Sequence, residues 1–252
     1  LYLAPTLYFD LVHSRALEPA AVSSVEAVAY AGAPMTGALV EKVAAAFAPR
    51  IFVNHYGSTE IYTFAVHQAQ HAKPGCAGRA ALNARLRLEP EGEGEILCHM
   101  SSDEAFTGYW NRPDADEKAI RDGWYHTGDV GRLDEDGDLW VVGRVDDMII
   151  SGGENIHPVE VEEVLARHPG VRDVAVVGEP DERWGERVTA FVVPATLDLT
   201  AEELDRHCRQ SPDLANFKRP RRVVFVREIP KTASGKILRR LLREGQYVEI
   251  RR

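Results

Sequence analysis

Residues 143–162 read GRVDDMIISGGENIHPVEVE, and the pattern of the chain changes within this stretch. Pro158 stands where the first turn of a helix tolerates proline, and Gly170 stands where that helix would end. Strand patterns at DVAVVGE and RVTAFVVP follow, and Thr200 and Glu203 have the spacing of a capping box that opens a helix to about Gln210. A strand at RRVVFV and a basic amphipathic helix at KILRRLLRE complete the series. The stretch therefore predicts the start of a small α+β domain of about 105 residues, a size that can fold alone.

The residues before this stretch follow another pattern. Apolar residues recur at helical spacing over 36–48, and a short buried strand is predicted at 51–53. A further strand is predicted at 94–99, and an Asp-Gly turn predicts a hairpin at 133–143. The charged segment 143–149 is the expected junction between the two parts of the chain.

Charge is distributed unevenly along the chain. The net charge is −9, yet the segment from Lys218 onward carries twelve Lys or Arg residues against three Glu. Such a tail suits a nucleic-acid surface, a site for a small polyanion, or a solvated helix face. Few aromatic residues interleave with the basic run, which argues against nucleic acid. No apolar run approaches the roughly 20 residues that span a membrane.

The cysteines and histidines give little support to a metal or disulfide framework. Cys76, Cys98 and Cys208 form no pair with metal-ligand spacing, and no signal peptide is visible, so we expect buried thiols in a reducing cytoplasm. His67 and His71 have the i,i+4 spacing of a helical zinc pair. No third ligand supports that site, and we expect a surface pair.

A Gly-Lys pair lies near the end of the chain, in PKTASGKILRR at 230–240. A Walker A loop needs a glycine five residues before this pair and a Ser or Thr after it. Pro230 and Ile237 hold those positions, so the spacing excludes that loop. Lys236 is left as either a catalytic cation or a charge at the start of a helix.

Four other stretches carry candidate chemistry: AGAPM (31–35), NHYGSTE (54–60), GWYHTGD (123–129) and the run at 143–162. With PKTASGK, their order and spacing resemble the adenylate-forming enzymes, which include acyl- and aryl-CoA synthetases, luciferases and adenylation domains. DDMIISGGENIHP, DERWGE and LANFKRPRR most resemble aryl-CoA ligases of the chlorobenzoate type.

This resemblance implies a fold of α/β and α+β parts. Residues 1–145 would form the C-terminal portion of a large ATP- and acyl-binding domain, and residues 146–252 a small mobile α+β domain. The family's phosphate loop, rich in Gly, Ser and Thr, is not in this sequence. The chain therefore resembles the C-terminal part of a larger enzyme, and we expect little or no ligase activity from it alone.

The resemblance also implies a reaction in two steps. A carboxylic acid attacks the α-phosphate of ATP to give an acyl-adenylate and pyrophosphate, and the thiol of CoA then displaces AMP. The first step concentrates negative charge, so it calls for Mg²⁺ and cations around the phosphate oxygens. ATP, Mg²⁺ and coenzyme A are thus expected as substrates rather than bound prosthetic groups.

Individual residues match positions of the family's motifs. The catalytic positions are Lys236, Thr59 and Glu60, and Glu60 also matches the magnesium ligand. The ATP- or AMP-binding positions are Gly32, Ala33, Asn54, Tyr56, Gly57, Asp129 and Arg144. The acyl-pocket positions are Ala31 and Ile61, and the CoA positions are Gly152, Gly153, Trp184, Phe217, Arg219 and Arg221. Asp146 matches the hinge of the mobile domain.

Each motif also has a simpler interpretation. Gly57 suits any tight loop, Asp129 any turn, and Trp184 ordinary packing. The apolar residues 61–64 and the lack of an obvious cation for a second carboxylate favour a benzoate-like or other aromatic acid, with a medium-chain fatty acid second. The alternatives are an adenylation domain that loads a carrier protein and a non-catalytic remnant that holds nucleotide or CoA. The expected partners are the acid, ATP and CoA, without nucleic acid or membrane, and a homodimer is an open alternative.

Overall fold

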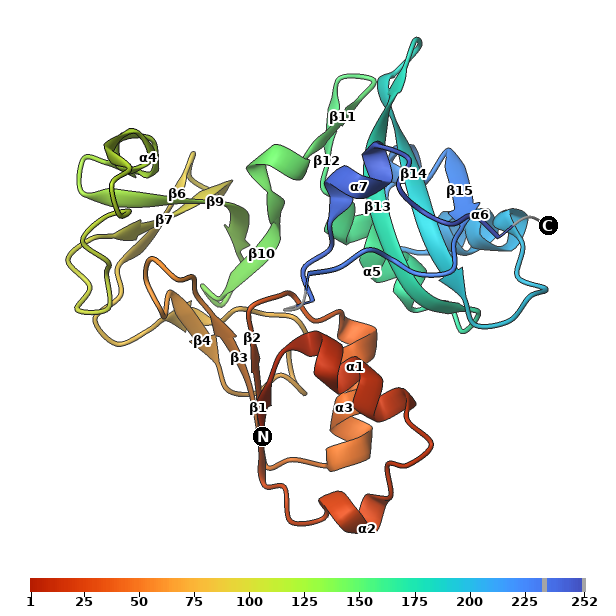
Figure 1. Ribbon diagram of the computed structural model, residues 1–252, viewed down its shortest axis with the longest axis horizontal. Helices are drawn as coiled ribbons and strands as arrows, with labels where there is room; N and C mark the ends of the chain where they lie inside the picture. Colours follow the sequence, from red (N-terminus) through yellow and green to blue (C-terminus); the bar gives the residue numbers. More distant parts are fainter. Residues whose placement is uncertain (233–234, 251–252) are drawn as a thin grey trace. The chain divides into compact units, whose positions relative to one another are not determined.

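The computed structural model describes residues 1–232 and 235–250, and the chain separates into two compact units, Leu1–Val142 and Gly143–Arg252 (Figure 1). They are named the first unit and the second unit. The division falls three residues before the boundary expected between 145 and 146. Within the described residues, no helix is both long and apolar enough to cross a membrane.

The first unit opens with a five-stranded sheet in the order β1-β2-β3-β4-β5. The parallel strands are β1 (Tyr2–Leu3), β2 (Ala27–Ala31) and β3 (Ile51–Tyr56), and the antiparallel ones are β4 (Ala65–His67) and β5 (Arg79–Ala80). The helices of this region are α1 (Pro5–His13), α2 (Pro19–Val22) and α3 (Gly37–Phe47). The helix predicted at 36–48 is confirmed as α3, where the side chain of Thr36 accepts the N–H of Leu39 at 3.4 Å as an N-cap.

Helices cover one face of this sheet, and the other face carries a different set of side chains. Val28, Tyr30 and Phe52 are fully buried in one cluster with Tyr8 of α1 and Val43 of α3. Side chains alternate along a strand, so the residues between them, such as Ala29 and Val53, point to the opposite face. That face carries a pocket, described with the candidate site.

A second sheet completes the first unit. Its strands are β6 (Leu86–Glu89), β7 (Glu93–His99), β9 (Trp124–Leu133) and β10 (Leu139–Arg144), in the order β10-β9-β7-β6, with β8 (Ile120–Arg121) beside β9. The helix α4 (Pro113–Ala119) precedes β8. The strand predicted at 94–99 is confirmed as β7, and the hairpin predicted at 133–143 is confirmed as the turn between β9 and β10, where Gly137 has φ +79°.

The second unit is built around one sheet in the order β12-β11-β14-β13, with β15 parallel to β14. Its elements are the 3-10 helix η1 (Val145–Asp147), β11 (Ile149–Ser151), β12 (Glu154–Ile156), α5 (Pro158–Ala166), β13 (Val171–Asp181), β14 (Gly185–Pro194), α6 (Ala201–Gln210), η2 (Asn216–Lys218), β15 (Arg222–Phe225) and α7 (Arg239–Arg243). The predicted capping box is confirmed at α6, where Thr200 and Glu203 each accept the other's N–H.

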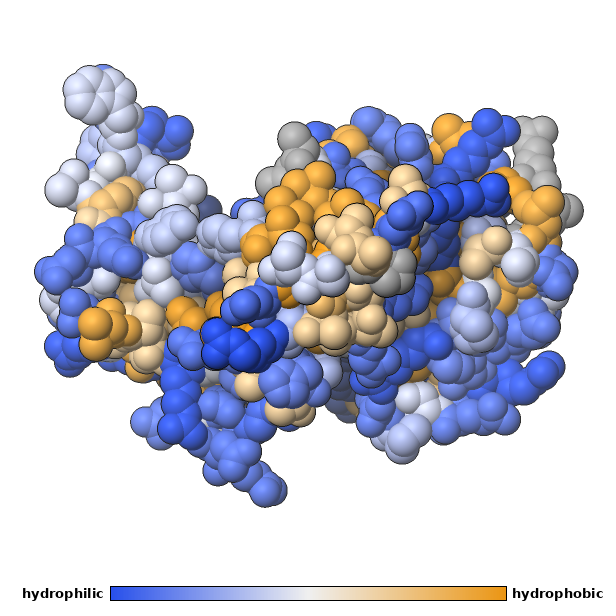
Figure 2. Space-filling view, turned by 90° about the horizontal axis from the view of Figure 1, so that it is seen from below, coloured by the Kyte–Doolittle hydropathy of each residue, from blue (hydrophilic) through white to orange (hydrophobic). Residues whose placement is uncertain are grey.

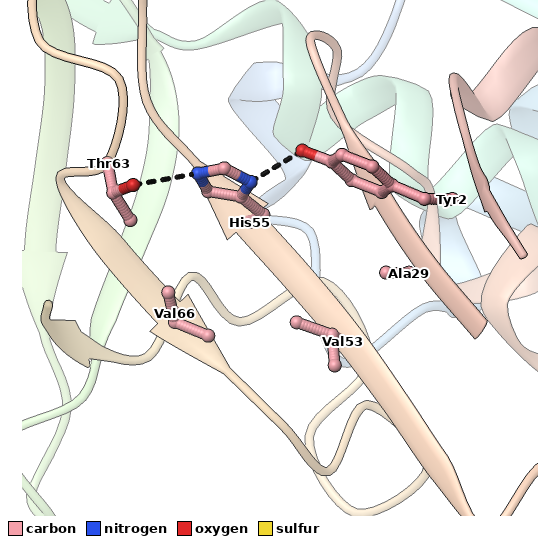
Figure 3. A pocket seen from close by; sticks show the side chains of 6 residues that line it. All are labelled: Tyr2, Ala29, Val53, His55, Thr63 and Val66. Atoms are coloured by element: carbon pink, nitrogen blue, oxygen red, sulfur yellow. Dashed lines mark hydrogen bonds between the residues drawn. The ribbon is translucent and has the colours of Figure 1, made fainter. Parts of the chain in front are cut away.

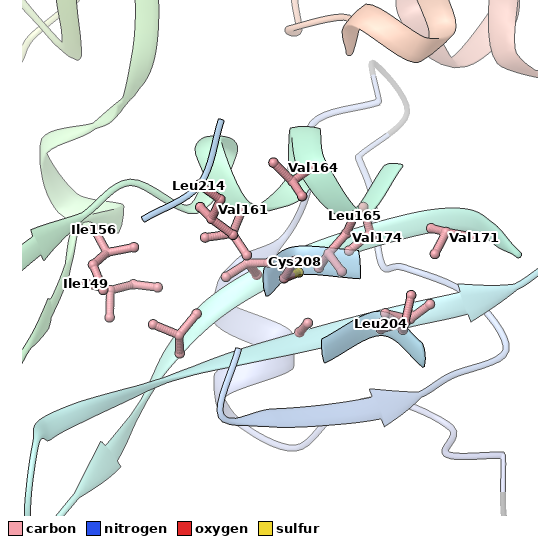
Figure 4. Close-up of a cluster of buried hydrophobic side chains, with 14 of the residues drawn as sticks. Ile149, Ile156, Val161, Val164, Leu165, Val171, Val174, Leu204, Cys208 and Leu214 are labelled. Atoms are coloured by element: carbon pink, nitrogen blue, oxygen red, sulfur yellow. The ribbon is translucent and has the colours of Figure 1, made fainter. Parts of the chain in front are cut away.

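Both faces of the long strands β13 and β14 are buried. Val174 and Val176 pack with Val161 and Leu165 of α5 and with Leu204 of α6 (Figure 4). The alternate residues Ala175 and Val177 pack on the other face in a cluster with Phe191 and with Leu242 of α7. The small unit therefore has a continuous hydrophobic core on each side of its sheet.

The last helix differs from its prediction. A helix was expected over KILRRLLRE from Lys236, but α7 begins at Arg239. Lys231 and Ile237 instead form an antiparallel bridge, and the N–H of Leu238 donates to the carbonyl of Pro230 at 2.8 Å. These bonds hold Lys236 in a hairpin-like loop before the helix, because its neighbours pair across the loop rather than along a helix.

Polar and charged residues occupy most of the molecular face drawn in Figure 2. Apolar side chains are gathered there in smaller groups, as on other folded domains. The three cysteines are free and buried.

Candidate functional site

The candidate site of the first unit lies at the carboxyl ends of β2 and β3. These strands are parallel neighbours, and Ala31 at the end of β2 lies beside His55 of β3. Gly32 follows with φ +85°, and no atom lies within 4 Å of where its Cβ would be. Ala31, Gly32 and Ala33 therefore line the same edge of the sheet as the loop 57–64, which follows β3. Ligands of open α/β sheets commonly bind at such an edge.

Gly57 is required by a close contact within that loop. A Cβ at this position would lie 1.8 Å from the carbonyl oxygen of Tyr62, so no other residue fits without moving the backbone. The loop closes through bonds from the N–H of Ser58 to the carbonyl of Ile61 and from the N–H of Phe64 to the carbonyl of Tyr56. The fold of the loop therefore requires glycine at position 57, in addition to the close approach of a nucleotide that the resemblance implies.

Glu60 lies on this loop with its carboxylate bound by a tyrosine. The hydroxyl of Tyr109 donates to Glu60 Oε1 at 2.7 Å, and the N–H of Glu60 donates to Ser58 Oγ at 3.1 Å. Burial acts to raise the pKa of the Glu60 carboxyl, but hydrogen bonds from Tyr109 and Ser58 outweigh it, and the pKa lies below its usual range. An ionised carboxylate on a loop beside the exposed Thr59 is the kind of single ligand that suits Mg²⁺ with phosphates and water.

Asp129 meets the same region from the second sheet. Tyr56 donates its hydroxyl to Asp129 Oδ2 at 2.7 Å, although the two residues are 73 positions apart. Thr127 Oγ1 accepts the N–H of Asp129 at 3.0 Å and donates to the carbonyl of Ile96 at 2.7 Å. The structure therefore brings the predicted nucleotide motifs NHYGSTE and HTGD into direct contact.

A glutamate that the sequence did not single out holds the turn before Asp129. Glu95 Oε1 accepts the N–H of Gly128 at 2.9 Å, and Gly128 has φ +71°. The other oxygen, Oε2, lies 2.9 Å from Nδ1 of His126. The turn before Asp129 is thus held by Glu95, which binds the N–H of Gly128 and contacts the His126 ring.

Two of the predicted site residues make contacts in the interior of the first unit. Asn54 donates its amide to the carbonyl of Cys76 at 2.9 Å, which ties β3 to a neighbouring loop. Ile61 is fully buried in a cluster with Phe64 and Tyr125. Its side chain fills the core, so its apolar character has a reason other than an acyl group.

A pocket of about 290 Å³ opens on the helix-free face of the first sheet (Figure 3). His55 stands at its rim, with Nδ1 at 2.5 Å from the hydroxyl of Tyr2 and Nε2 at 3.1 Å from Thr63 Oγ1. The remaining lining residues are apolar: Ala29, Val53 and Val66. The sequence analysis did not identify His55 and Tyr2 as pocket residues. His55 could have been found, because it lies inside the motif NHYGSTE and alternation along β3 places it on the same face as Val53.

A second group of predicted residues comes together in the second unit. Gly152 has φ +63°, its N–H donates to the carbonyl of Trp184 at 2.8 Å, and a Cβ there would lie 2.9 Å from the indole ring. The guanidinium groups of Arg183 and Arg221 each lie 4.8 Å from the centre of that ring. Gly153, with φ +86°, has open space beside it. Three of the predicted CoA residues, Gly152, Trp184 and Arg221, therefore form one surface.

The basic tail is largely paired with acidic residues of its own unit. Arg219 binds Asp205 of α6, and Lys218 binds Glu160 of α5. The remaining pairs are Arg222–Glu179, Lys231–Asp173, Arg239–Glu162, Arg240–Glu244 and Arg243–Asp147. The positive charge of the tail is thus largely neutralised within the second unit, mostly by acidic residues that lie upstream in the chain. Phe217 is 42% exposed beside this region.

Lys236 is exposed on the loop before α7. Its N–H donates to Thr232 Oγ1 at 3.0 Å, and its carbonyl accepts the N–H of Thr232 at 2.9 Å. Gly235 has φ +87° and donates its N–H to the carbonyl of Thr232 at 2.9 Å. Arg144 and Asp146 are also exposed, at the end of β10 and in η1.

Groups with metal-ligand chemistry occur elsewhere in the first unit. Asp134, Asp136 and Asp138 surround Nζ of Lys73 at 2.9, 2.7 and 2.6 Å, so the ammonium group occupies the centre of the acidic turn. His67 lies near Cys76 and Asp138, and its Nδ1 is 2.9 Å from the amide of Gln70. The three aspartates therefore already bind a protein partner, in agreement with the turn expected within 133–143.

Comparison with known proteins follows the same division of the chain. Residues 1–110 match the model of the AMP-binding enzymes, and residues 160–236 match that of the AMP-binding enzyme C-terminal domain. A 4-chlorobenzoate–CoA ligase of an Arthrobacter species is 40% identical over 253 residues, which cover 97% of this chain and 48% of that protein.

Solved structures give a similar picture. An anthranilate CoA ligase in complex with anthranoyl-AMP matches with a TM-score of 0.87 and 31% identity, over 97% of this chain and 49% of that one. An amide bond synthetase from Marinactinospora thermotolerans matches with a TM-score of 0.87 and 33% identity, over 97% of this chain and 51% of that one. The chain spans about half the length of the relatives it matches. It belongs to the AMP-binding, adenylate-forming enzyme family.

Proposed function

We propose that the protein that carries this chain is an ATP-dependent carboxylic acid–CoA ligase, which forms an acyl-adenylate and then an acyl-CoA thioester. The observation that carries the proposal is the contact between Tyr56 and Asp129, which joins two nucleotide motifs next to the Glu60 loop. Its relatives include an enzyme named as a 4-chlorobenzoate–CoA ligase and one solved with anthranoyl-AMP.

In the first step, a carboxylate oxygen of the acid bonds to the α-phosphorus of ATP, and the bond to the β-phosphate oxygen breaks to release pyrophosphate. The side-chain oxygens of Asp129 would accept hydrogen bonds from the ribose hydroxyls. Thr59 supplies a hydroxyl, and Glu60 would hold Mg²⁺, which would neutralise phosphate charge when bound. Lys236 would bring an ammonium group to the reacting oxygens, where charge accumulates.

In the second step, the thiol of CoA loses its proton and bonds to the carbonyl carbon, and AMP leaves with the electron pair of the broken bond. The surface formed by Gly152, Trp184 and Arg221 would receive the pantetheine arm and a phosphate of CoA. Arg219 would bind a phosphate of CoA only after it exchanges its ion pair with Asp205 for that phosphate. We propose that Asp146, exposed in η1, is the hinge that lets the second unit serve both steps in turn.

The proposed substrate is an aromatic acid. The Arthrobacter relative and the solved anthranilate ligase are both named for aromatic acids. The pocket in Figure 3 has apolar walls from Ala29, Val53 and Val66, with the polar rim at His55, and this lining suits a ring with a polar edge. A medium-chain fatty acid is the second candidate, because most of the lining is apolar.

The test is pyrophosphate release by the full-length natural protein against a panel of carboxylic acids, with and without CoA. The proposal predicts release that depends on an aromatic acid, together with a thioester when CoA is present. Absence of acid-dependent release would end the adenylation proposal. Release without any thioester would favour transfer to a carrier protein or to an amine, the second by analogy with the amide bond synthetase.

A further inference from the structure

Arg239 begins α7 three residues after Lys236, and its guanidinium group lies inside the second unit. Its Nη2 donates to both carboxylate oxygens of Glu162, at 2.7 and 2.8 Å, and its Nε donates to the carbonyl of Val176 at 3.2 Å. The N–H of Val176 donates in turn to Glu162 Oε1 at 2.7 Å. The side chains of Arg239 and Glu162 are only 12% and 8% exposed. These bonds tie the start of α7 to both α5 and β13.

The other stem of the Lys236 loop is fixed to the same strand. Lys231 forms an ion pair with Asp173 of β13 at 2.6 Å and bridges to Ile237 across the loop. Leu238 closes the base by its bond to Pro230. Lys236 is therefore carried by a loop with one stem bound to β13 through Lys231 and the other through Arg239.

A buried ion pair that holds a loop stem in place contributes little net free energy to folding. Desolvation of the two charges offsets much of their attraction, and apolar residues of similar volume often stabilise a fold as well or better. The pair does supply direction, because a planar guanidinium group accepts only certain geometries around its donors. An apolar contact would fill the same space without fixing the direction in which the loop leaves the core.

We infer that Glu162 and Arg239 are positioning residues for adenylation, and that their buried pair fixes the start of α7 so that the loop presents Lys236 to the reacting oxygens. The inference rests on the proposed function, in which Lys236 serves the first step. Neither residue touches substrate. Their effect is transmitted through Ile237 and Leu238, the two residues between Lys236 and Arg239.

The decisive variant is Glu162→Leu/Arg239→Met, which replaces the pair with apolar residues. It is expected to fold, since no unpaired charge is left inside. In the full-length protein, adenylation should fall by about 100-fold, as for other small misplacements of a catalytic group. Thioester formation from supplied acyl-adenylate should stay within about twofold, because that step does not use Lys236 in the proposed function.

Two further variants at Arg239 and one control variant at Glu244 bracket this result. Arg239→Lys keeps the charge but loses the fork, and its loss of adenylation should be intermediate. Arg239→Gln should also lose adenylation selectively. Burial already raises the pKa of Glu162, so in this variant the Glu162 carboxyl can take up a proton instead of remaining an unpaired buried charge. Glu244→Gln removes the exposed pair between Glu244 and Arg240 of α7, and it should leave both half-reactions unchanged.

The outcomes separate this inference from the function on which it rests. Failure of the unsubstituted protein to adenylate any acid, or full adenylation by Lys236→Ala, would overturn the proposed function itself. If those two proteins behave as proposed and the double variant adenylates at the normal rate, the positioning role is wrong. An equal fall in both half-reactions would also overturn it, since the pair would then serve only the fold.

Discussion

The Glu60 carboxylate is oriented by a hydrogen bond from a residue far away in sequence. Tyr109, 49 positions later, donates to one of its oxygens at 2.7 Å. That bond orients the carboxylate and stabilises its charge in a partly buried place, where burial alone would favour the protonated form. In the proposed function Glu60 holds Mg²⁺, and loss of a residue that orients a metal ligand typically lowers metal affinity by about 10- to 100-fold.

Tyr109→Phe is therefore expected to weaken the use of Mg²⁺. The ring still fills its space, but Glu60 loses its donor, so the Mg²⁺ concentration for half-maximal pyrophosphate release should rise by roughly tenfold. The same shift should appear in binding of Mn²⁺, followed by water-proton relaxation in the presence of ATP.

The matched control is Tyr62→Phe, an exposed tyrosine on the same loop that leaves the bond between Tyr109 and Glu60 intact. It should keep the normal requirement for Mg²⁺. An unchanged requirement in Tyr109→Phe as well would show that Glu60 is not the metal ligand or is held by other groups.

At the scale of elements, the loop after β3 depends on the absence of one side chain. In Gly57→Ala the new Cβ would meet the carbonyl of Tyr62 at 1.8 Å, so the loop must move and take Glu60 with it. We expect adenylation to fall by about 100-fold, because the loop that carries Thr59 and Glu60 is displaced. Measurement of acid-dependent pyrophosphate release and of thermal unfolding tests this expectation.

Gly32→Ala provides the comparison at the neighbouring strand end. Its Cβ would find open space, but the residue has φ +85°, so the cost is backbone strain of about 1–2 kcal/mol without a clash. Stability should fall by that amount, and adenylation should fall by less than in Gly57→Ala because the loop that carries Glu60 keeps its place. A larger loss of adenylation from Gly32→Ala than from Gly57→Ala would contradict the contact described for the loop.

Local signals in the sequence predicted several elements well. Pro158 and the Thr200–Glu203 pair marked helix starts that the structure confirms, because these signals act within the first turn of a helix. The start of α7 was placed too early. The bridge between Lys231 and Ile237 competes with the helix, and nothing local in KILRRLLRE announces that pairing.

At the scale of the whole molecule, the distribution of charge was the hardest feature to anticipate. The sequence suggested a free basic tail, yet Arg222 and Arg239 pair with Glu179 and Glu162, which lie 43 and 77 positions away. Tyr109 was missed for the same reason. Contacts between distant segments depend on the folded arrangement, whereas the motifs that carry the resemblance are contiguous and were legible at once.

The central proposal is that two separate parts of the second unit serve the two half-reactions, Lys236 the first and the surface around Gly152 and Trp184 the second. It predicts that Lys236→Ala and Gly152→Ala fail in opposite ways. Lys236→Ala removes a cation from the first step, where loss of one such group typically costs about 100-fold or more. Gly152→Ala places a methyl group 2.9 Å from the Trp184 ring and disturbs the surface proposed for CoA.

The most direct test measures both half-reactions for these two variants of the full-length protein, with Gly245→Ala as the control for strain at a positive φ without a nearby contact. The account predicts that Lys236→Ala loses pyrophosphate release but converts supplied acyl-adenylate to thioester. It predicts that Gly152→Ala keeps pyrophosphate release and loses about 10- to 100-fold in thioester formation. Loss of the same half-reaction in both variants, or equal loss of both, would contradict it.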